Sequence, residues 1–142
     1  MTTPPERQAI AERQLCGLVS GLAQRIAEHV RECAGALGIT ASQATALREM
    51  SGPMTMRELA ERMSCEPSNT TFVVDKLEKQ HLIERHPHPT DRRAKHLVLT
   101  AEGTALRARL LELLAVDAPL SGLDPQEQRV LHGLLERAID RR

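Results

Sequence analysis

The sequence has almost no aromatic residues: its 142 residues include one Phe and neither Trp nor Tyr. A surface that stacks nucleic-acid bases needs several exposed rings, so this mode of binding is excluded. Strands favour aromatic and β-branched side chains, whereas this chain is rich in Ala, Leu, Glu and Arg, which disfavours a β-sandwich. The chain also lacks net charge, because 19 Lys and Arg balance 19 Asp and Glu. A DNA-binding hypothesis must therefore rest on the local placement of charge.

Cysteines and long apolar runs are scarce as well. The three cysteines are widely spaced and form no C-x-x-C pair, which disfavours a disulfide scaffold and a zinc finger. No apolar stretch approaches the roughly 18 residues of a membrane span. Residues 1–6 lack the basic start and apolar run of a signal peptide. We therefore expect no membrane association and a location in the reducing cytoplasm.

The apolar periodicity predicts a mainly helical chain. Residues 6–36 carry apolar side chains at steps of three and four and predict one helix of about 30 residues, a length that suggests packing against a partner. Capping-box sequences at Thr40–Gln43, Thr55–Glu58 and Asp124–Glu127 predict the starts of three further helices. Pro67 suits the first position of a helix that runs to about Gln80. Thr100 caps another helix, which is expected to end near residue 117.

The spacing of the apolar residues is no longer helical between residues 82 and 100. Leu82–His86 and Lys95–Thr100 are short apolar or β-branched runs, and the segment between them is rich in proline. We predict a two-stranded hairpin with a long tip, so the fold class is mainly α with a small β-hairpin wing (α+β). Two short helices joined by a tight turn and followed by a hairpin form the order of a winged helix-turn-helix. Such a unit can place its second helix in the major groove of DNA.

Six short segments between residues 40 and 103 resemble the MarR family of bacterial transcriptional regulators. They are Leu59–Arg62, Pro67–Thr70, Val74–Glu78, Leu82–Arg85, Asp91–Lys95 and Leu99–Thr100. The resemblance implies a homodimer, with dimerisation helices in residues 1–38 and 101–142 and a winged helix-turn-helix domain in residues 39–100. It implies a cytoplasmic repressor, without a cofactor, that binds an inverted repeat in double-stranded DNA and is released by a small-molecule effector.

The second helix of the pair, residues 67–80, carries the first group of candidate DNA-binding residues. Helical spacing turns Thr70, Val73, Val74 and Leu77 toward the core and leaves Ser68, Asn69, Phe72 and Lys76 on the other side, with Thr71 at the margin. Small polar residues at a helix start can bond phosphates or base edges, although Ser68 or Asn69 could also cap the helix. Lys76 suits a phosphate. The ring of Phe72 either contacts a thymine methyl group or folds back against the wing or a neighbouring helix.

The hairpin tip carries the second group: Arg92, Arg93 and Lys95, with Asp91 as the only carboxylate beside them. Arginines on a wing can enter a narrow A·T-rich minor groove, where negative potential is concentrated. In the family, the arginine that matches Arg93 does this, and the aspartate that matches Asp91 orients it through an ion pair. The alternative is a solvated charged turn.

Other chemistries find weaker support. His86 and His88 have a metal-compatible spacing, but Pro87 and Pro89 interrupt the strand, so we expect no metal site. Cys16 lies roughly where a peroxide-sensing branch of the family carries its reactive thiol, yet that branch also uses tyrosines, which this chain lacks. Cys65, beside a helix start, is a second candidate thiol.

A dimeric ligand-binding protein or thiol-based redox sensor with weak or no DNA binding is the alternative function. No nucleophile triad, phosphate-binding loop or spaced pair of carboxylates indicates an enzyme.

Overall fold

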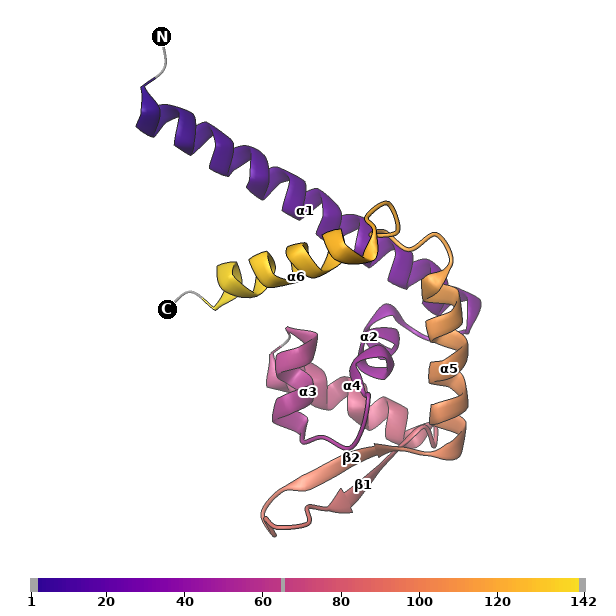
Figure 1. Cartoon of the computed structure of the whole chain (residues 1–142). Coiled ribbons are helices and arrows are strands. Elements are labelled where there is room, and N and C mark those ends of the chain that lie inside the picture. Colours follow the sequence, from indigo (N-terminus) through magenta and orange to yellow (C-terminus); the bar gives the residue numbers. More distant parts are fainter. Residues whose placement is uncertain (1–2, 65, 141–142) are drawn as a thin grey trace. The chain divides into compact units, whose positions relative to one another are not determined.

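The computed structural model describes residues 3–64 and 66–140, so Cys65 lies outside the described residues. Within these ranges the chain is mostly helical with one antiparallel hairpin, which confirms the predicted fold class (Figure 1). The elements are α1 (Pro4–Ala36), α2 (Ala41–Glu49), α3 (Met56–Met63), α4 (Pro67–Lys79), β1 (Ile83–Pro87), β2 (Lys95–Leu99), α5 (Ala101–Ala115) and α6 (Pro125–Ile139).

The chain divides into two compact units. One consists of residues 27–116, and the other consists of residues 1–26 and 117–142. In the first unit α2 packs against α3, α4 and α5, while the hairpin contacts α3, α4 and α5. The largest fully buried side chains in this unit are those of Leu47, Met50, Met54, Leu59, Thr70, Val74, Leu77, Ile83, Leu97 and Leu110.

The three predicted capping boxes are all formed. The hydroxyl of Thr40 accepts a hydrogen bond from the backbone N–H of Gln43 (3.1 Å), and that of Thr55 accepts one from Glu58 (3.1 Å). The carboxylate of Asp124 caps α6 in the same way. Each cap satisfies N–H groups that a helix start leaves without an intrahelical partner. The starts of α2, α3 and α6 are therefore set by local sequence.

The hairpin forms in the predicted region, and β1 pairs with β2 from Ile83↔Leu99 to Pro87↔Lys95. A backbone bridge that the sequence did not indicate adds Met54 to the other side of β2. Met54 N–H donates to the carbonyl of Leu97 (3.2 Å), and Leu97 N–H donates to the carbonyl of Met54 (2.7 Å). The bridge ties the segment before α3 to the base of the wing.

The base of the wing is also fixed to the start of α5. The hydroxyl of Thr100 donates to the carbonyl of His81 (2.7 Å) and accepts from the N–H of Gly103 (3.0 Å). Thr100 N–H donates to the carbonyl of Leu82 (3.1 Å). Gly103 is buried directly against that carbonyl, where a side chain would have no room. The wing therefore emerges from a well-anchored base.

The second unit leaves large apolar side chains uncovered. Those of Leu15, Leu18 and Val19 in α1 and of Val130, Leu134 and Ile139 in α6 are each more than half exposed. In the described ranges, no helix combines the length and the apolar character that crossing a bilayer demands.

Candidate nucleic-acid interface

The helix-turn-helix consists of α3 and α4. Ser64 ends α3 in the left-handed region (φ 52°), which turns the chain sharply toward α4. Glu66 holds the N-cap position of α4 and makes no side-chain capping bond. Ser68 and Asn69 thus lie in the first turn of α4 and not at the cap, and both are exposed.

The two faces of α4 are those that the spacing predicts. Thr70, Val73, Val74 and Leu77 are buried, and Ser68, Asn69, Thr71, Phe72 and Lys76 are exposed. The hydroxyl of Thr70 donates to the carbonyl of Glu66 (3.3 Å), so this buried polar group is satisfied within the helix. The exposed face presents short polar groups, one ring and one ammonium group to solvent. This face is chemically suited to a groove of DNA.

Phe72 does not fold back into the protein. Its side chain is 62% exposed, and the ammonium nitrogen of Lys76 lies 4.7 Å from its ring centroid. This is the geometry of a cation–π contact. Lys76 thereby covers part of the ring, and the remaining edge stays exposed on the surface of α4.

The tip of the wing is organised by His88. Its ring nitrogen Nδ1 accepts hydrogen bonds from the backbone N–H groups of Thr90 (3.2 Å) and Asp91 (3.0 Å). Sequence reasoning missed this role, because it considered His88 only as a metal ligand or as a solvated residue of the wing. The one local signal was its position two and three residues before the amides that it binds.

The expected ion pair between Asp91 and Arg93 is not formed among the described residues. Oδ1 of Asp91 instead accepts the backbone N–H of Arg93 at 3.0 Å. The physical reason is the tight turn of the tip, which brings that amide to the carboxylate and closes an Asx-type turn. Arg92 and Arg93 are both exposed, as is Lys95 at the start of β2. Asp91 thus shapes the backbone from which the arginines project.

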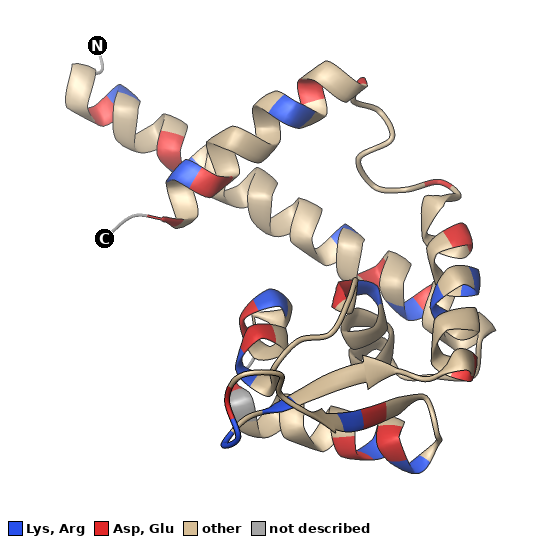
Figure 2. Cartoon of the chain, turned by 60° about the horizontal axis from the view of Figure 1, so that its bottom comes forward, with Lys and Arg blue, Asp and Glu red and all other residues tan. Residues whose placement is uncertain are grey.

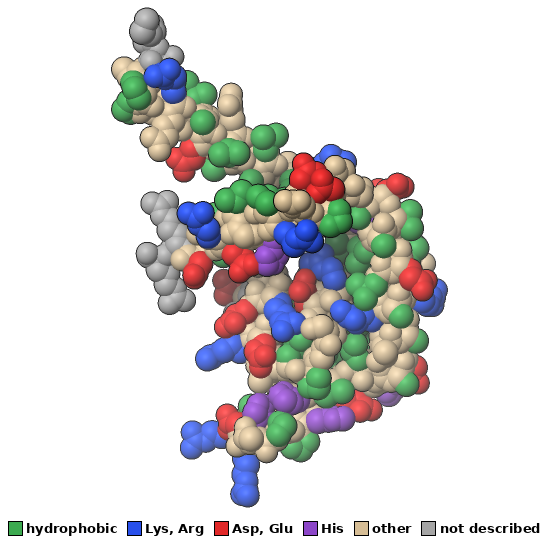
Figure 3. Space-filling model, viewed as in Figure 1, with side chains coloured by type: hydrophobic (Ala, Val, Ile, Leu, Met, Phe, Trp, Pro, Cys, Tyr) green, Lys and Arg blue, Asp and Glu red, His purple; other side chains and the backbone are tan. Residues whose placement is uncertain are grey.

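Charge is distributed unevenly over the unit of residues 27–116. Basic residues lie at the wing tip, whereas α4 carries both signs (Figure 2). In the space-filling view, basic side chains project from the end of the wing, and histidines gather behind them (Figure 3). The rings of His88 and His96 lie 4.4 Å apart, and Nε2 of His86 lies 3.0 Å from the carboxylate of Glu84. No cluster of three potential ligands in the described ranges has a geometry that would hold a metal ion.

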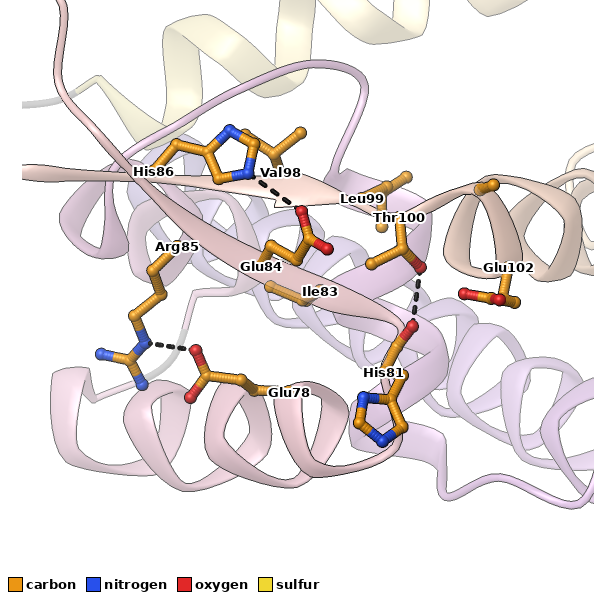
Figure 4. A pocket seen from close by; sticks show the side chains of 11 residues that line it. Glu78, His81, Ile83, Glu84, Arg85, His86, Val98, Leu99, Thr100 and Glu102 are labelled. Atoms are coloured by element: carbon orange, nitrogen blue, oxygen red, sulfur yellow. Dashed lines mark hydrogen bonds and ion pairs between the residues drawn. The ribbon is translucent and has the colours of Figure 1, made fainter.

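An open groove of about 920 Å³ lies beside the wing base, between the end of α4, the two strands and the start of α5 (Figure 4). Its lining includes the carboxylates of Glu78, Glu84 and Glu102. Arg85 is its only arginine, and that guanidinium already contacts Glu78. The excess of carboxylates makes the groove unsuited to an anion such as a DNA phosphate. The candidate interface is therefore confined to the exposed face of α4 and the wing tip.

A helix-turn-helix with an exposed second helix, followed by a two-stranded wing, defines a winged helix-turn-helix protein. Residues 39–95 match the model of the MarR family, which confirms the resemblance found in the motifs. The chain belongs to the MarR family.

Three comparisons illustrate this relationship. Over 106 residues the chain is 34% identical to YsmB, an HTH-type transcriptional regulator of Bacillus subtilis, covering 72% of this chain and 70% of that protein. Over 87 residues it is 36% identical to the transcriptional repressor MdtR of the same species, covering 60% of this chain and 56% of MdtR. A crystal structure of a MarR mutant from E. coli complexed with operator DNA has a TM-score of 0.70 and 26% identity, covering 88% of this chain and 93% of that one. Several curated relatives, MdtR among them, are matched over less than two thirds of their own length.

Proposed function

We propose that this chain is a homodimeric, sequence-specific DNA-binding regulator of transcription in the cytoplasm. It acts as a repressor that leaves an inverted-repeat operator when a small-molecule effector binds. One observation carries the proposal: the unit of residues 27–116 presents an exposed polar face of α4 together with a wing whose tip bears exposed arginines. No catalytic role is proposed.

In this proposal α4 enters the major groove and the wing follows the neighbouring minor groove. Ser68, Asn69 and Thr71 contact phosphates or base edges, and Lys76 contacts a phosphate. The ring of Phe72 contacts a thymine methyl group. Arg92, Arg93 and Lys95 supply positive charge at the minor groove, and Asp91 holds the turn that presents them. Residues 39–100 form the DNA-binding domain.

The homodimer is supported by the apolar side chains of the second unit. Leu15, Leu18, Val130 and Leu134 are each more than half exposed. Covering one such side chain contributes on the order of 1 kcal/mol, so a helix face of this kind favours association. Residues 1–38 and 101–142 are the proposed dimerisation segments. A two-fold dimer would read half-sites spaced by about 10 bp, one turn of DNA.

Dimerisation is tested by sedimentation at micromolar concentration. We expect the wild type to sediment as a dimer and Leu134→Glu to shift toward monomer, because a buried carboxylate at the interface is costly. The matched control is Arg137→Glu on the same helix. A monomeric wild type would refute the dimer.

DNA binding is tested with sites selected from a random pool, using fluorescence anisotropy at several salt concentrations. Arg93→Ala should lose about 1–3 kcal/mol, or about 5- to 150-fold in affinity, and should reduce the salt slope by about one. Arg109→Ala removes an exposed arginine from α5 and serves as the control. Equal affinity of the Arg93→Ala variant and the wild type would remove the wing from the interface.

The proposed effector is a small molecule and not an oxidant. Cys16 is an exposed thiol, but the chain has no tyrosine to hold a thiolate there. Peroxide is therefore expected to release neither the wild type nor Cys16→Ser from DNA. Release of the wild type alone would favour the redox-sensor alternative.

A further inference from the structure

One arginine outside the candidate interface connects the wing to α4. Arg85 lies in β1, and its Nη2 is 2.5 Å from Oδ1 of Asp75 while its Nε is 3.2 Å from Oε2 of Glu78. Both carboxylates belong to α4, and the bond to Glu78 is drawn in Figure 4. A single guanidinium thus bridges two elements that are proposed to enter different grooves.

The sequence explains why the bridge forms here. Alternation along β1 places Arg85 on the same face as the buried Ile83, which is the face that packs on the protein. Asp75 and Glu78 are three residues apart and lie on one side of α4. A guanidinium has a planar fork of donors, so two carboxylates one helical turn apart fix its orientation as well as its position.

The bridge made by Arg85 holds the strand of the wing that the backbone bridge at Met54 does not hold. Thr100 on His81 holds the base of the hairpin, and Met54 on Leu97 holds the edge of β2 that faces away from β1. Arg85 pairs with Leu97 in the hairpin register, so it holds β1 to α4 at the level at which the Met54 bridge holds β2 to the segment before α3. In the described ranges, the two ion pairs of Arg85 are those that join β1 to α4. Their loss would leave β1 without an ion pair to α4 among the described residues, while the bridge at Met54 would hold β2 alone.

We propose that Arg85 is a positioning residue that sets the angle between α4 and the wing, so that both engage DNA at once. This inference rests on the proposed function. Arg85 itself contacts no DNA, because its guanidinium is engaged by Asp75 and Glu78. The three side chains are 33%, 51% and 42% exposed, and ion pairs so exposed contribute little to stability. Loss of the bridge should therefore affect DNA binding much more than folding.

The test combines Arg85→Gln with Arg93→Ala in a double-mutant cycle on the selected DNA site. Arg85→Gln should weaken binding on the order of tenfold. In that background Arg93→Ala should cost no more than about twofold further, because a wing that is no longer aligned has already lost the contact. Arg85→Lys should not restore the coupling, since a lysine keeps the charge but lacks the fork. The urea midpoint of each variant should stay close to that of the wild type.

Arg48→Gln is the matched control. Arg48 is also 33% exposed and is paired with Glu49 at 3.0 Å, but it lies on α2. It should change neither the affinity nor the penalty of Arg93→Ala. If Arg85→Gln does not fold, Asp75→Asn combined with Glu78→Gln removes the same bridge from the helix side. This double variant also separates positioning from charge. If the two carboxylates acted only through their negative charge, removing them would raise the affinity for DNA and leave the penalty of Arg93→Ala unchanged.

Hydrogen exchange of the free protein gives a readout that does not depend on DNA. Amides in the outer part of the hairpin should exchange faster in Arg85→Gln than in the wild type or in Arg48→Gln. An unchanged Arg93→Ala penalty, full rescue by lysine or unchanged exchange would each overturn the role of Arg85 and leave the regulator intact. Failure of the wild type to bind any selected DNA would instead overturn the proposed function and, with it, the positioning role.

Discussion

Gly103→Ala should destabilise the protein, although alanine is normally the better helix former. Gly103 lies in the first turn of α5 and is buried against the backbone of Leu82. A Cβ atom at this position would lie 3.0 Å from the carbonyl carbon of Leu82 and would overlap its oxygen. That oxygen also accepts a hydrogen bond from Thr100 N–H (3.1 Å). Neither backbone segment can move away without disturbing the joint between α5 and the wing.

The magnitude follows from two opposing effects. Replacing glycine by alanine in a helix gains about 1 kcal/mol from conformational entropy. Overpacking of a close contact costs about 1–3 kcal/mol, and the upper end applies here because the obstructing atoms belong to the backbone. We expect a net loss of about 2 kcal/mol in the free energy of unfolding. DNA affinity should fall as well, since Leu82 leads directly into β1.

Urea unfolding at one fixed protein concentration measures the effect, because association would make the midpoint depend on concentration. Gly35→Ala is the control. Gly35 is helical and exposed, and a Cβ atom there would have no atom within 4 Å. It should be neutral or stabilising by up to about 1 kcal/mol. If the two variants are equally stable, the close approach of Gly103 to Leu82 is wrong.

Three further predictions concern the caps, the wing tip and a buried thiol. Thr55→Ala should lower the free energy of unfolding by about 1 kcal/mol, and Thr55→Ser should largely retain it, as measured in urea. His88→Ala should weaken DNA binding in anisotropy titrations, whereas His88→Asn should retain most of it, because the amide oxygen can accept the same backbone N–H groups. Burial, aided by Glu32, raises the pKa of the Cys33 thiol, so less thiolate is present at a given pH. Peptide-resolved alkylation at pH 8 should therefore be slower at Cys33 than at Cys16, and the stabilisation linked to this proton should disappear as the pH rises past the thiol's usual range.

Local sequence predicted much of the fold because the signals involved are local. The capping boxes at Thr40, Thr55 and Asp124 are formed by residues three positions apart, so they can be read without knowing the tertiary structure. The buried and exposed faces of α4 follow from helical period alone. The hairpin was predicted from the change of period, with its ends displaced by one residue.

Long-range contacts and the use of individual polar groups could not be predicted in this way. The backbone bridge between Met54 and Leu97 joins two residues that lie far apart in the chain. Because Met54 belongs to no strand, no repeating sequence pattern marks its contact with β2. The carboxylate of Asp91 had two possible partners in Arg93, and only the backbone conformation decides between the amide and the guanidinium. Arg85 appeared as one charge in a strand, because its partners lie on another element.

A chain with no net charge presents a cationic surface here only through the local placement of its charges. Three carboxylates near the candidate interface are engaged within the protein: those of Asp75 and Glu78 by Arg85, and that of Asp91 by a backbone amide. Arg85 compensates one of the two negative charges on α4, and the amide that binds Asp91 compensates none, so the cationic excess is confined to Arg92, Arg93 and Lys95 beside Asp91. Because the excess is local and small, few phosphates can be neutralised, and binding to DNA of random sequence should be weak with a shallow dependence on salt. Selectivity would then depend on the face of α4 and the angle of the wing, which are the two features that Arg85 connects.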